Sequence, residues 1–505
     1  NYGGGFGRNQ IASSGVGIPN ATVELYDNLG ALVFTTTTDA AGQYTFAGMV
    51  NGTFTARVVN SLVPSTRPNG NSCGTCVPIQ TYKADYLGST IIPDVNTVGG
   101  NTPSTTDPGA GTLAGAQSTA TITIINEGAV GIDFGFNFNT IVNTNETGQG
   151  SLEQFIVNSN NLGETGLDIV ANSIFDPTSG EDTSIFMIPT TGDPLGRTPD
   201  VNFASGYFDI FISNGAQLTE LTSSNTIIDG RTQTAYSGDT NSGTIGLGAS
   251  NVGISATVLP NYNLPEIQVR GDTREVFRND GTLNTIRNLA IFLDDKSAIQ
   301  VNDGSLNVFE NLIGVNAMGV NTGDMEYGVE ITDGTATISR NFLSGSNEAA
   351  IFVNGGTSTI IDYNHIYRNG TNDTCTDNIL IQNGSGIVIR YNLINESAGV
   401  GIEGDDYAAG LLITENTITN NGINNSACGG GIFDDAGIRL KAANATISHN
   451  IIHSNQGEGV VVADNVSGIL ISRNSFYNNG QRAPSLGIDL DESKEMGDGV
   501  TLNDN

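Results

Sequence analysis

Short apolar runs alternate with Asn- and Gly-rich breaks from about residue 284 to residue 490, and one phrase returns with the same local pattern. In it an apolar run leads into an asparagine, as in IRN, FEN, SRN, DYN, RYN, TEN, SHN and a second SRN. The intervals between successive asparagines share one basic length, which insertions extend in three of them. A basic period of about 23–24 residues is typical of a repeat architecture.

Each repeat contains two or three strand-like runs. One run precedes the asparagine, as at Ile360-Ile361 and Leu412-Ile413, and another follows about ten residues later, as at residues 350–353. Short runs rich in Ile and Val and separated by Asn and Gly predict strands and turns. No window shows the 3.6-residue spacing of a long helix. The pattern therefore predicts an all-β chain with a parallel β-solenoid, whose interior is filled by stacked Ile, Val, Leu and Phe.

The recurring asparagines predict a column at one corner of the coils. A tight bend between two sheets often needs a left-handed backbone conformation, which Asn tolerates better than other non-glycine residues. Stacked at a strand spacing of about 4.8 Å, the side-chain amides can hydrogen-bond along the column as they do in cross-β ladders. The residues expected in this column are Asn288, Asn311, Asn341, Asn364, Asn392, Asn416, Asn450 and Asn474.

The first part of the chain has a different pattern. Short runs in which apolar and polar residues alternate recur there at regular spacing. Runs separated by turn sequences lie at residues 23–26, 32–38, 44–46 and 54–58. Hairpins at this spacing predict a small antiparallel β-sandwich. Residues 96–119 are rich in Thr, Gly, Pro, Ser and Ala and predict a flexible excursion or linker. Runs at 120–125 and 131–136 would close the sandwich, which we place at residues 1–138.

The segment GIPNATVELYDNLGALVFTTTTDAAGQYTFAGMVNGTFTARVV resembles the B-type, prealbumin-like repeat of bacterial surface adhesins. Such domains usually open with a further strand, whereas this sequence begins at Asn1-Tyr2-Gly3. The resemblance therefore implies a sandwich that lacks one strand. Either a longer parent chain or a neighbouring molecule would supply it.

A second resemblance covers the start of the solenoid. The phrase IVNTNETGQGSLEQFIVNSNN is similar to the segment before the first coil in large adhesins with right-handed β-helices. Ser151 to Gln154 form a capping box, and Leu152, Phe155 and Ile156 give one apolar helix face. We expect a short helix that caps the open end of the solenoid. Residues 139–505 are thus predicted to form a right-handed parallel β-helix.

The coils before residue 284 have an irregular pattern. Strand candidates lie at residues 185–188, 208–212, 226–229 and 266–270, and residues 231–256 predict a large projecting loop. The phrase LGIDLDESKEMGDGVTLNDN resembles a motif after the final coil of the same adhesins, in which the chain continues. The sequence is therefore expected to be a segment of a larger protein.

Composition restricts the partners and the cellular location. The 505 residues include only 14% charged side chains, with a formal net charge of −33. This acidic balance argues against binding to nucleic acid or to an anionic membrane surface. No stretch of about 18 apolar residues predicts a membrane-spanning helix. The acidic, Gly-rich composition agrees with a secreted protein of the bacterial cell surface.

Four cysteines fall into two pairs. Cys73 and Cys76 form a CxxC in a turn-like context, which favours a local disulfide over a redox site or half of a zinc site. Cys375 follows Asn364, and Cys428 follows Asn416, at nearly the same offset. Because both belong to inserted loops at matching phase, we expect them to form a disulfide across one intervening coil, with two separate thiols as the alternative.

Parallel β-helices also include polysaccharide lyases and hydrolases, which need converging carboxylates. The paired candidates are Asp294-Asp295, Asp405-Asp406 and Asp434-Asp435, but their phases relative to the asparagines differ, and paired aspartates are common in turns. Arg439 and Lys441 are expected to form salt bridges with Asp434 or Asp435. No catalytic centre is therefore predicted.

Metal and cofactor signals are weak. His365, His449 and His453 are the only histidines, and their positions do not suggest a shared site. Calcium is the one ion with a candidate ligand set, since Asp489, Asp491, Glu492 and Asp498 follow the last coil and Ca²⁺ favours oxygen ligands from flexible loops.

Together these features predict a secreted, cell-surface structural or adhesive protein. Its partner would be an extracellular polysaccharide, another surface ligand, or copies of itself in an extracellular fibre. The alternative is a polysaccharide lyase or glycoside hydrolase on the same scaffold.

Overall fold

The computed structural model describes residues 16–70, 73–169, 175–322, 324–370, 376–423, 435–463, 466–482 and 486–490. The chain forms two compact units. Unit 1 comprises residues 1–211 and 225–240, and unit 2 comprises residues 212–224 and 241–505. The predicted boundary at 138/139 marks the change from sandwich to coils and stays a prediction, because unit 1 contains both the sandwich and the first coils.

The N-terminal sheet is built mainly of antiparallel strands. Its order is β2-β1-β3-β6-β4-β5, with β7 paired to β4. Among the described pairings of this sheet, only β4 and β6 run parallel. A short 3₁₀ helix, η2 (Asn60–Leu62), follows β3. The strands are β1 (Thr22–Tyr26), β2 (Leu32–Thr37), β3 (Gly52–Val58), β4 (Ile79–Leu87), β5 (Thr90–Asp94), β6 (Ser118–Ile124) and β7 (Phe134–Asn137).

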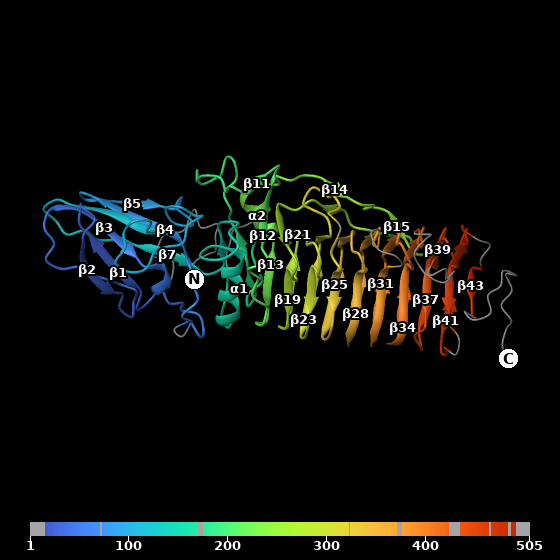
Figure 1. Cartoon of the computed structure of the whole chain (residues 1–505). Coiled ribbons are helices and arrows are strands. Elements are labelled where there is room, and N and C mark those ends of the chain that lie inside the picture. The colour runs from blue at the N-terminus through green and yellow to red at the C-terminus, as the bar shows by residue number, and fades with distance from the viewer. Residues whose placement is uncertain are drawn as a thin grey trace. The chain divides into compact units, whose positions relative to one another are not determined.

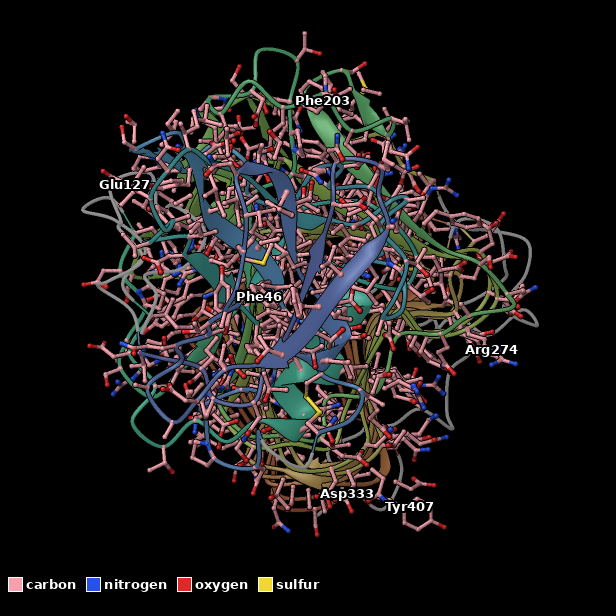
Figure 2. All side chains as sticks on the ribbon, turned by 90° about the vertical axis from the view of Figure 1, so that its left-hand side faces the viewer. Phe46, Glu127, Phe203, Arg274, Asp333 and Tyr407 are labelled. Carbon is pink, nitrogen blue, oxygen red and sulfur yellow. A yellow bond between two sulfur atoms is a disulfide. The ribbon has the colours of Figure 1, made fainter. Side chains whose placement is uncertain are left out.

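The sandwich core lies between β7 and the face of β1 and β3. Val23 and Val58 pack with Phe134 and Phe136 of β7. The sequence pattern missed β4, which pairs with β7 through its first half and with β5 through its second. The predicted strand at 44–46 was wrong, because these residues form no strand. Instead Phe46 packs into the core, as its place inside the sandwich in Figure 2 illustrates.

The predicted excursion at 96–119 contains no strand before Ser118, and polar contacts anchor it against the sheet, while its flexibility stays a prediction. Arg57 on β3 is fully buried and forms salt bridges with Glu24 (2.9 Å) and with Asp107 of the excursion (3.0 Å). The Asp107 carboxylate also accepts hydrogen bonds from the backbone N–H groups of Asn60 and Gln117. A buried Arg without these partners would be costly, so the low-complexity segment is held in one place by charge.

The rest of unit 1 contains a helix and the first coils. Helix α1 (Leu152–Asn161) begins at Ser151, whose hydroxyl accepts a hydrogen bond from the Gln154 N–H, and Leu152, Phe155 and Ile156 are buried as the sequence predicted. Its role as an end cap stays a prediction. The other elements are β8 (Thr140–Ile141), β9 (Asp182–Thr183), β10 (Ile185–Phe186), β11 (Phe203–Ala204), β12 (Tyr207–Ile212), β13 (Thr226–Asp229) and α2 (Arg231–Ser237). Strands β8 and β10 pair in parallel, as do β9 and β13.

Unit 2 is a parallel solenoid in which each coil contributes one strand to each of three sheets. Figure 1 shows these strands side by side from yellow to red. Sheet 1 contains β20 (Asn284–Arg287), β23 (Ser305–Phe309), β26 (Thr335–Ser339), β29 (Ile360–Asp362), β32 (Val388–Arg390), β35 (Leu412–Thr414), β38 (Thr446–Ser448) and β41 (Leu470–Ser472).

Sheet 2 of this unit contains β18 (Ile267–Gly271), β21 (Ala290–Phe292), β24 (Leu312–Ile313), β27 (Phe342–Leu343), β30 (His365–Tyr367), β33 (Leu393–Asn395), β36 (Thr417–Thr419), β39 (Ile451–His453) and β42 (Ser475–Tyr477). Sheet 3 contains β19 (Phe277–Asn279), β22 (Ile299–Val301), β25 (Tyr327–Ile331), β28 (Ala349–Thr357), β31 (Asp377–Ser385), β34 (Ile402–Ala409), β37 (Ile438–Leu440), β40 (Val460–Val462) and β43 (Ile488–Asp489). The first corner joins sheet 1 to sheet 2, and the second corner joins sheet 2 to sheet 3.

The solenoid interior consists of apolar rows that run along the axis. In sheet 1 one inward position is aligned from coil to coil, and its fully buried row is Ile286, Val308, Ile338, Ile361, Ile389, Ile413 and Ile447. Burying each such side chain contributes about 2 kcal/mol. The all-β class and the parallel solenoid predicted from the sequence are confirmed.

Residues 241–265 form a strap along the outside of sheet 2. The strap contains β14 (Thr244–Ile245), β15 (Asn251–Val252), β16 (Thr257–Val258) and β17 (Tyr262–Asn263), paired as two antiparallel ladders. In Figure 1 β14 and β15 lie over later coils of the solenoid. The predicted projecting loop at 231–256 was therefore wrong: its first part is α2, and the rest lies flat against the protein.

Candidate functional site

The first corner of the solenoid carries a buried column of asparagines. The Oδ1 of Asn364 accepts hydrogen bonds from both the backbone N–H (2.8 Å) and the side-chain Nδ2 (3.1 Å) of Asn341, one coil earlier. The Nδ2 of Asn364 also donates to the carbonyl of Ile338 in the preceding coil. The same pattern joins Asn311, Asn341, Asn364, Asn392, Asn416, Asn450 and Asn474.

Two details of the predicted column need correction. Asn288 does not belong to it, because the register places Leu289 opposite Asn311, and the Leu289 N–H donates to the Asn311 Oδ1. The left-handed residue is also generally not the column asparagine but the one before it. Positive φ values of 55–62° occur at Glu310, Arg340, Tyr363, Tyr391, Glu415, His449 and Arg473. The left-handed turn at the preceding residue thus allows the asparagine side chain to point inward and to hydrogen-bond along the column.

A second column, which the sequence analysis missed, lies at the second corner. Asn421 donates from its backbone and from its Nδ2 to the Asn455 Oδ1, and Asn455 does the same to Asn479. The column positions are Ser346, Asn369, Ser397, Asn421, Asn455 and Asn479, each five residues after an asparagine of the first column. This five-residue offset could have been found in the sequence, although Ser346 and Ser397 stand at two of the positions in place of asparagine.

An asparagine from sheet 3 fills the interruption of the second column. Asn378 accepts from the Asn369 Nδ2 through its Oδ1 (2.7 Å) and donates to the Asn421 Oδ1 (3.1 Å). It thereby bridges the coil in which the shorter Ser397 occupies the column position. Apart from the partly exposed Asn474 and Asn479 in the last coil, the asparagines of both columns are buried, and they bond to one another, so the columns stabilise the fold rather than supply groups for chemistry.

The strap covers the outer face of sheet 2 through polar and apolar contacts. The backbone N–H of Leu247 donates to the His365 Nδ1 (3.1 Å), and that of Ser255 donates to the Glu415 carboxylate (2.9 Å). Val252 and Leu259 pack against Leu393 and Tyr391 in one cluster. The Asn241 Nδ2 donates to the carbonyls of Pro265 and Ala317, which holds both ends of the strap.

Among the histidines, His365 has the most unusual environment. It is only 2% exposed, and burial lowers its pKa to about 4 even though the hydrogen bond to Asn395 opposes the shift. Because its Nδ1 accepts from Leu247, its Nε2 carries the proton and donates to the Asn395 Oδ1 (3.0 Å). Burial also lowers the pKa of His453, which stacks on Tyr477 with ring centroids 4.5 Å apart. His449 lies at a first-corner turn.

The paired aspartates lie at separate places and have structural partners. Lys441 contacts Glu403 (2.7 Å) and Asp405 (3.5 Å), and Arg439 lies 3.8 Å from Glu403. Asp435 pairs with Arg482, and Asp434 lies outside the described residues, so the predicted bridges from these cations to Asp434 or Asp435 stay a prediction. Burial alone would lower the pKa of Lys441, but Glu403 raises it overall.

The other two pairs differ in their positions. Asp294 and Asp295 lie in a bend after β21, and the Asp294 N–H donates to the Asp272 carbonyl of the preceding coil. Asp405 and Asp406 lie within β34, so the interpretation of this pair as turn residues was wrong.

Calcium binding by the acidic side chains after the last coil remains a prediction. Asp489 is buried at the end of β43, while Asp491, Glu492 and Asp498 lie outside the described residues. Within the part of the chain that the structure describes, no three His, Cys, Asp or Glu side chains are grouped as a metal site requires.

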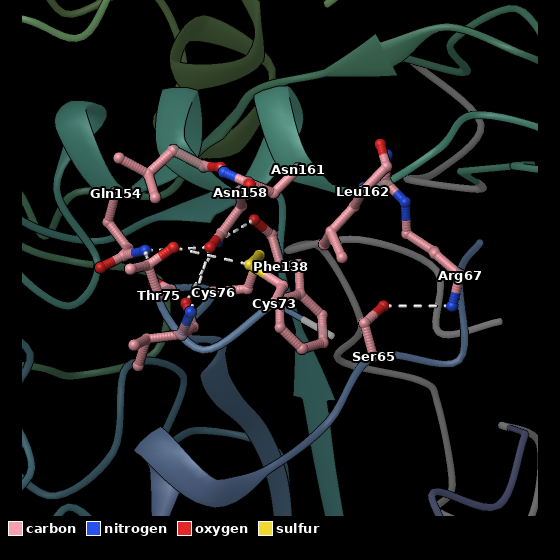
Figure 3. The surroundings of a disulfide bond; sticks show 12 residues. Ser65, Arg67, Cys73, Thr75, Cys76, Phe138, Gln154, Asn158, Asn161 and Leu162 are labelled. Carbon is pink, nitrogen blue, oxygen red and sulfur yellow. Dashed lines mark hydrogen bonds between the residues drawn. A yellow bond between two sulfur atoms is a disulfide. The ribbon is translucent and has the colours of Figure 1, made fainter. Parts of the chain in front are cut away.

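Cys73 and Cys76 form a disulfide with their Cα atoms 5.4 Å apart. Figure 3 shows the loop held against α1. The Gln154 Nε2 donates to the Thr75 carbonyl (2.9 Å), and the Asn158 Oδ1 accepts from the Val77 N–H (3.0 Å). This crosslink has a structural role in fixing the loop on the helix. Cys375 and Cys428 lie outside the described residues, so their predicted disulfide stays a prediction.

Sheet 1 and the first corner carry exposed side chains of mixed character. One outward row of sheet 1 contains Ile360, Val388 and Leu412 in consecutive coils, and Leu412 is 36% exposed. At the adjoining corner Tyr363 and Tyr391 stack with ring centroids 5.1 Å apart, and the exposed Arg340 guanidinium lies 5.5 Å from the Tyr363 ring centroid. This surface combines aliphatic, aromatic and guanidinium groups, a mixture suited to binding rather than to catalysis.

Two family models match the chain. The SdrD B-like domain matches residues 8–73, and the right handed beta helix region matches residues 267–434. Together they confirm the predicted adhesin-like combination of a B-type domain and a right-handed β-helix. Among curated proteins none matches the sequence. None of the helices in the described ranges is long and apolar enough to cross a membrane.

Several solved structures are similar at low identity. An alginate lyase from Paenibacillus sp. str. FPU-7 is 14% identical, covering 44% of this chain and 92% of that one, with a TM-score of 0.29. The Streptococcus pneumoniae surface protein and adhesin PfbA is 13% identical, covering 62% and 82%, with a TM-score of 0.23. The A-module of the Azotobacter vinelandii mannuronan C-5 epimerase AlgE6 is 12% identical, covering 56% and 88%, also at 0.23.

Proposed function

We propose that this chain is a secreted adhesive protein of the bacterial cell surface, whose solenoid presents a ligand-binding face. The observation that carries the proposal is the match of residues 8–73 to an SdrD B-like domain, followed in the same chain by a β-helix. A repetitive solenoid offers a long regular surface, which suits contact with an extended ligand.

The ligand face is assigned to sheet 1 and the first corner, because the strap occupies the outer face of sheet 2. The half-buried Tyr363 supplies aromatic surface and stacks on Tyr391, which itself packs against the strap, and the exposed Arg340 supplies hydrogen-bond donors beside Tyr363. Aromatic edges and a guanidinium are suited to the apolar faces and hydroxyl groups of sugars. The net charge of −33 would repel a polyanion, so an uncharged extracellular polysaccharide is the preferred ligand class.

A polysaccharide lyase or hydrolase remains the alternative function, and a fibre subunit is a further one. The engagement of Glu403 and Asp435 with cations favours binding over catalysis, because a catalytic carboxylate must be available to substrate. Release of unsaturated or reducing sugars from a panel of polysaccharides by the purified chain would favour the enzyme instead.

The binding face can be tested with Tyr363→Ala in the full chain. Loss of one aromatic contact should weaken by about tenfold the binding of a neutral polysaccharide that the wild type binds. Affinity electrophoresis or calorimetry measures this change. Tyr407→Ala is the matched control, because Tyr407 on sheet 3 is 78% exposed and points away from the solenoid in Figure 2. Equal affinity of the Tyr363 variant and the wild type would contradict the assigned face.

A further inference from the structure

The two outer strands of the N-terminal sheet differ in how they meet solvent. Strand β5 is one edge, and it carries Pro93 and Asp94, which discourage pairing with another strand. Among the described strands, β2, with the sequence LVFTTT, ends the sheet on its other side and carries neither Pro nor charge. Leu32, Val33 and Phe34 are 46%, 40% and 43% exposed. Such an unprotected β-prone edge is a template for strand addition.

The register shows which backbone groups of β2 point away from the sheet. The Thr38 N–H donates to the Ala21 carbonyl, and Thr36 is the residue opposite Val23. Because bonding directions alternate along an antiparallel pair, the N–H and C=O groups of Thr35 and Thr37 point outward. An irregularity at Val33 ends the regular ladder, so the regular outward groups begin at Thr35.

We propose that β2 pairs antiparallel with β2 of a second copy of this chain, about a two-fold axis at Thr36. In this register Thr35 of one copy faces Thr37 of the other, so every outward group of both residues is bonded. Phe34 faces Thr38, which places β-branched and aromatic side chains side by side as stable cross-strand pairs require. A two-fold contact of this kind closes on itself and gives a dimer.

Charge explains why a second copy fits this edge. Two molecules of net charge −33 repel each other over most of their surface, whereas β2 has no charged residue. Glu24, opposite Thr35 on β1, is buried and paired with Arg57. The nearest carboxylates along the chain are held in their own turns: Asp27 accepts from the N–H groups of Leu29 and Ala31, and Asp39 accepts from those of Ala41 and Gln43. Salt should therefore strengthen the dimer by screening the remaining repulsion.

The test is the mass of the full chain over a dilution series, by sedimentation velocity. The wild type should shift from monomer to dimer with concentration. Thr35→Pro removes an outward N–H from each copy without touching a bond to β1, and should weaken dimerisation by about tenfold. Thr35→Val, which keeps the N–H and the β-branched shape, should leave dimerisation unchanged.

A second variant guards against misfolding of the proline variant. Thr36→Glu places two carboxylates opposite each other at the two-fold axis, so it should abolish the dimer at low salt and recover part of it at high salt. A wild type that stays monomeric throughout, or a dimer that persists in both Thr35→Pro and Thr36→Glu, would overturn the proposal. Ligand binding at Tyr363 does not enter this test, so the two proposals can fail separately.

Discussion

The two corners of the solenoid solve the same geometric problem with different sequence regularity. At the first corner an asparagine follows each left-handed residue without interruption from Asn311 to Asn474. At the second corner Ser346 and Ser397 take the equivalent place, and Asn378 is inserted from sheet 3. A column is therefore a bonding arrangement rather than a sequence motif. An asparagine from another strand can complete the hydrogen bonding of the column, as Asn378 does between Asn369 and Asn421.

The two corners also differ in how they contact the strap. The first column bonds to itself and to the sheet 1 carbonyls, and the strap contacts the residues before the column asparagines: Ser255 bonds to the Glu415 carboxylate, and the Tyr262 hydroxyl bonds to the Tyr363 carbonyl. The second column is connected to the strap by hydrogen bonds between Asn378 and Asn395 and between Asn395 and His365. Both corners therefore help to hold the segment that covers sheet 2.

The largest expected effect comes from interrupting the first column. Asn392→Ala removes the bond from Nδ2 to the Ile361 carbonyl and leaves the buried Asn364 N–H without its acceptor. Several unsatisfied buried groups should lower the free energy of unfolding by about 3 kcal/mol or more. Urea unfolding with hydrogen exchange at neighbouring coils measures this.

Asn288→Ala is the control for that experiment, because Asn288 lies outside the column. This substitution should lower the free energy of unfolding by no more than about 1 kcal/mol, which is the penalty for a left-handed backbone conformation at alanine. Similar losses for both variants would remove the distinction between a column asparagine and a turn asparagine.

A smaller effect is expected from acid at His365, which lies under the strap on the outer face of sheet 2. The buried His365 has a pKa of about 4, below that of a free histidine, so its contribution is complete above about pH 6.5 and is lost as the pH falls toward 4. Between pH 7 and about pH 5 the strap should lose about 2 kcal/mol of stability. Hydrogen exchange of the amides at 247–259, corrected for intrinsic rates, reports this.

His365→Gln should remove the pH dependence, since glutamine does not titrate in this range. Exchange of the sheet 1 amides should stay constant over the same range. Acid-induced opening of sheet 1 together with the strap would show that His365 does not act on the strap alone.

The smallest effect is expected at Ser346. Its backbone N–H donates to the Asn369 Oδ1, but its buried hydroxyl makes no hydrogen bond within the described ranges. Ser346→Ala keeps the backbone bond and removes an unsatisfied group, so stability should change by less than about 0.5 kcal/mol, toward a more stable protein. A loss comparable to that of Asn392→Ala would mean that the hydroxyl has a role in the column.

Local periodicity could be read directly from the sequence. The repeat length, the parallel coils, the inward Ile and Val rows, the first column from Asn311 onward and the N-cap at Ser151 all depend on residues close in sequence or at constant phase. The error at Asn288 has a local cause. Asn311 stands opposite Leu289, the residue after Asn288, and a shift of one position moves a side chain to the opposite face.

Only the tertiary structure decided where the irregular segments lie. The strap at 241–265 and the excursion at 96–119 have the composition of loops. Their positions depend on distant partners, such as His365 and Glu415 for the strap and Arg57 for the excursion. The bridge by Asn378 likewise depends on a gap elsewhere in the chain. A sequence pattern reports which residues repeat, whereas a contact between non-repeating segments is fixed by the whole fold, because its partners meet only after the chain has coiled.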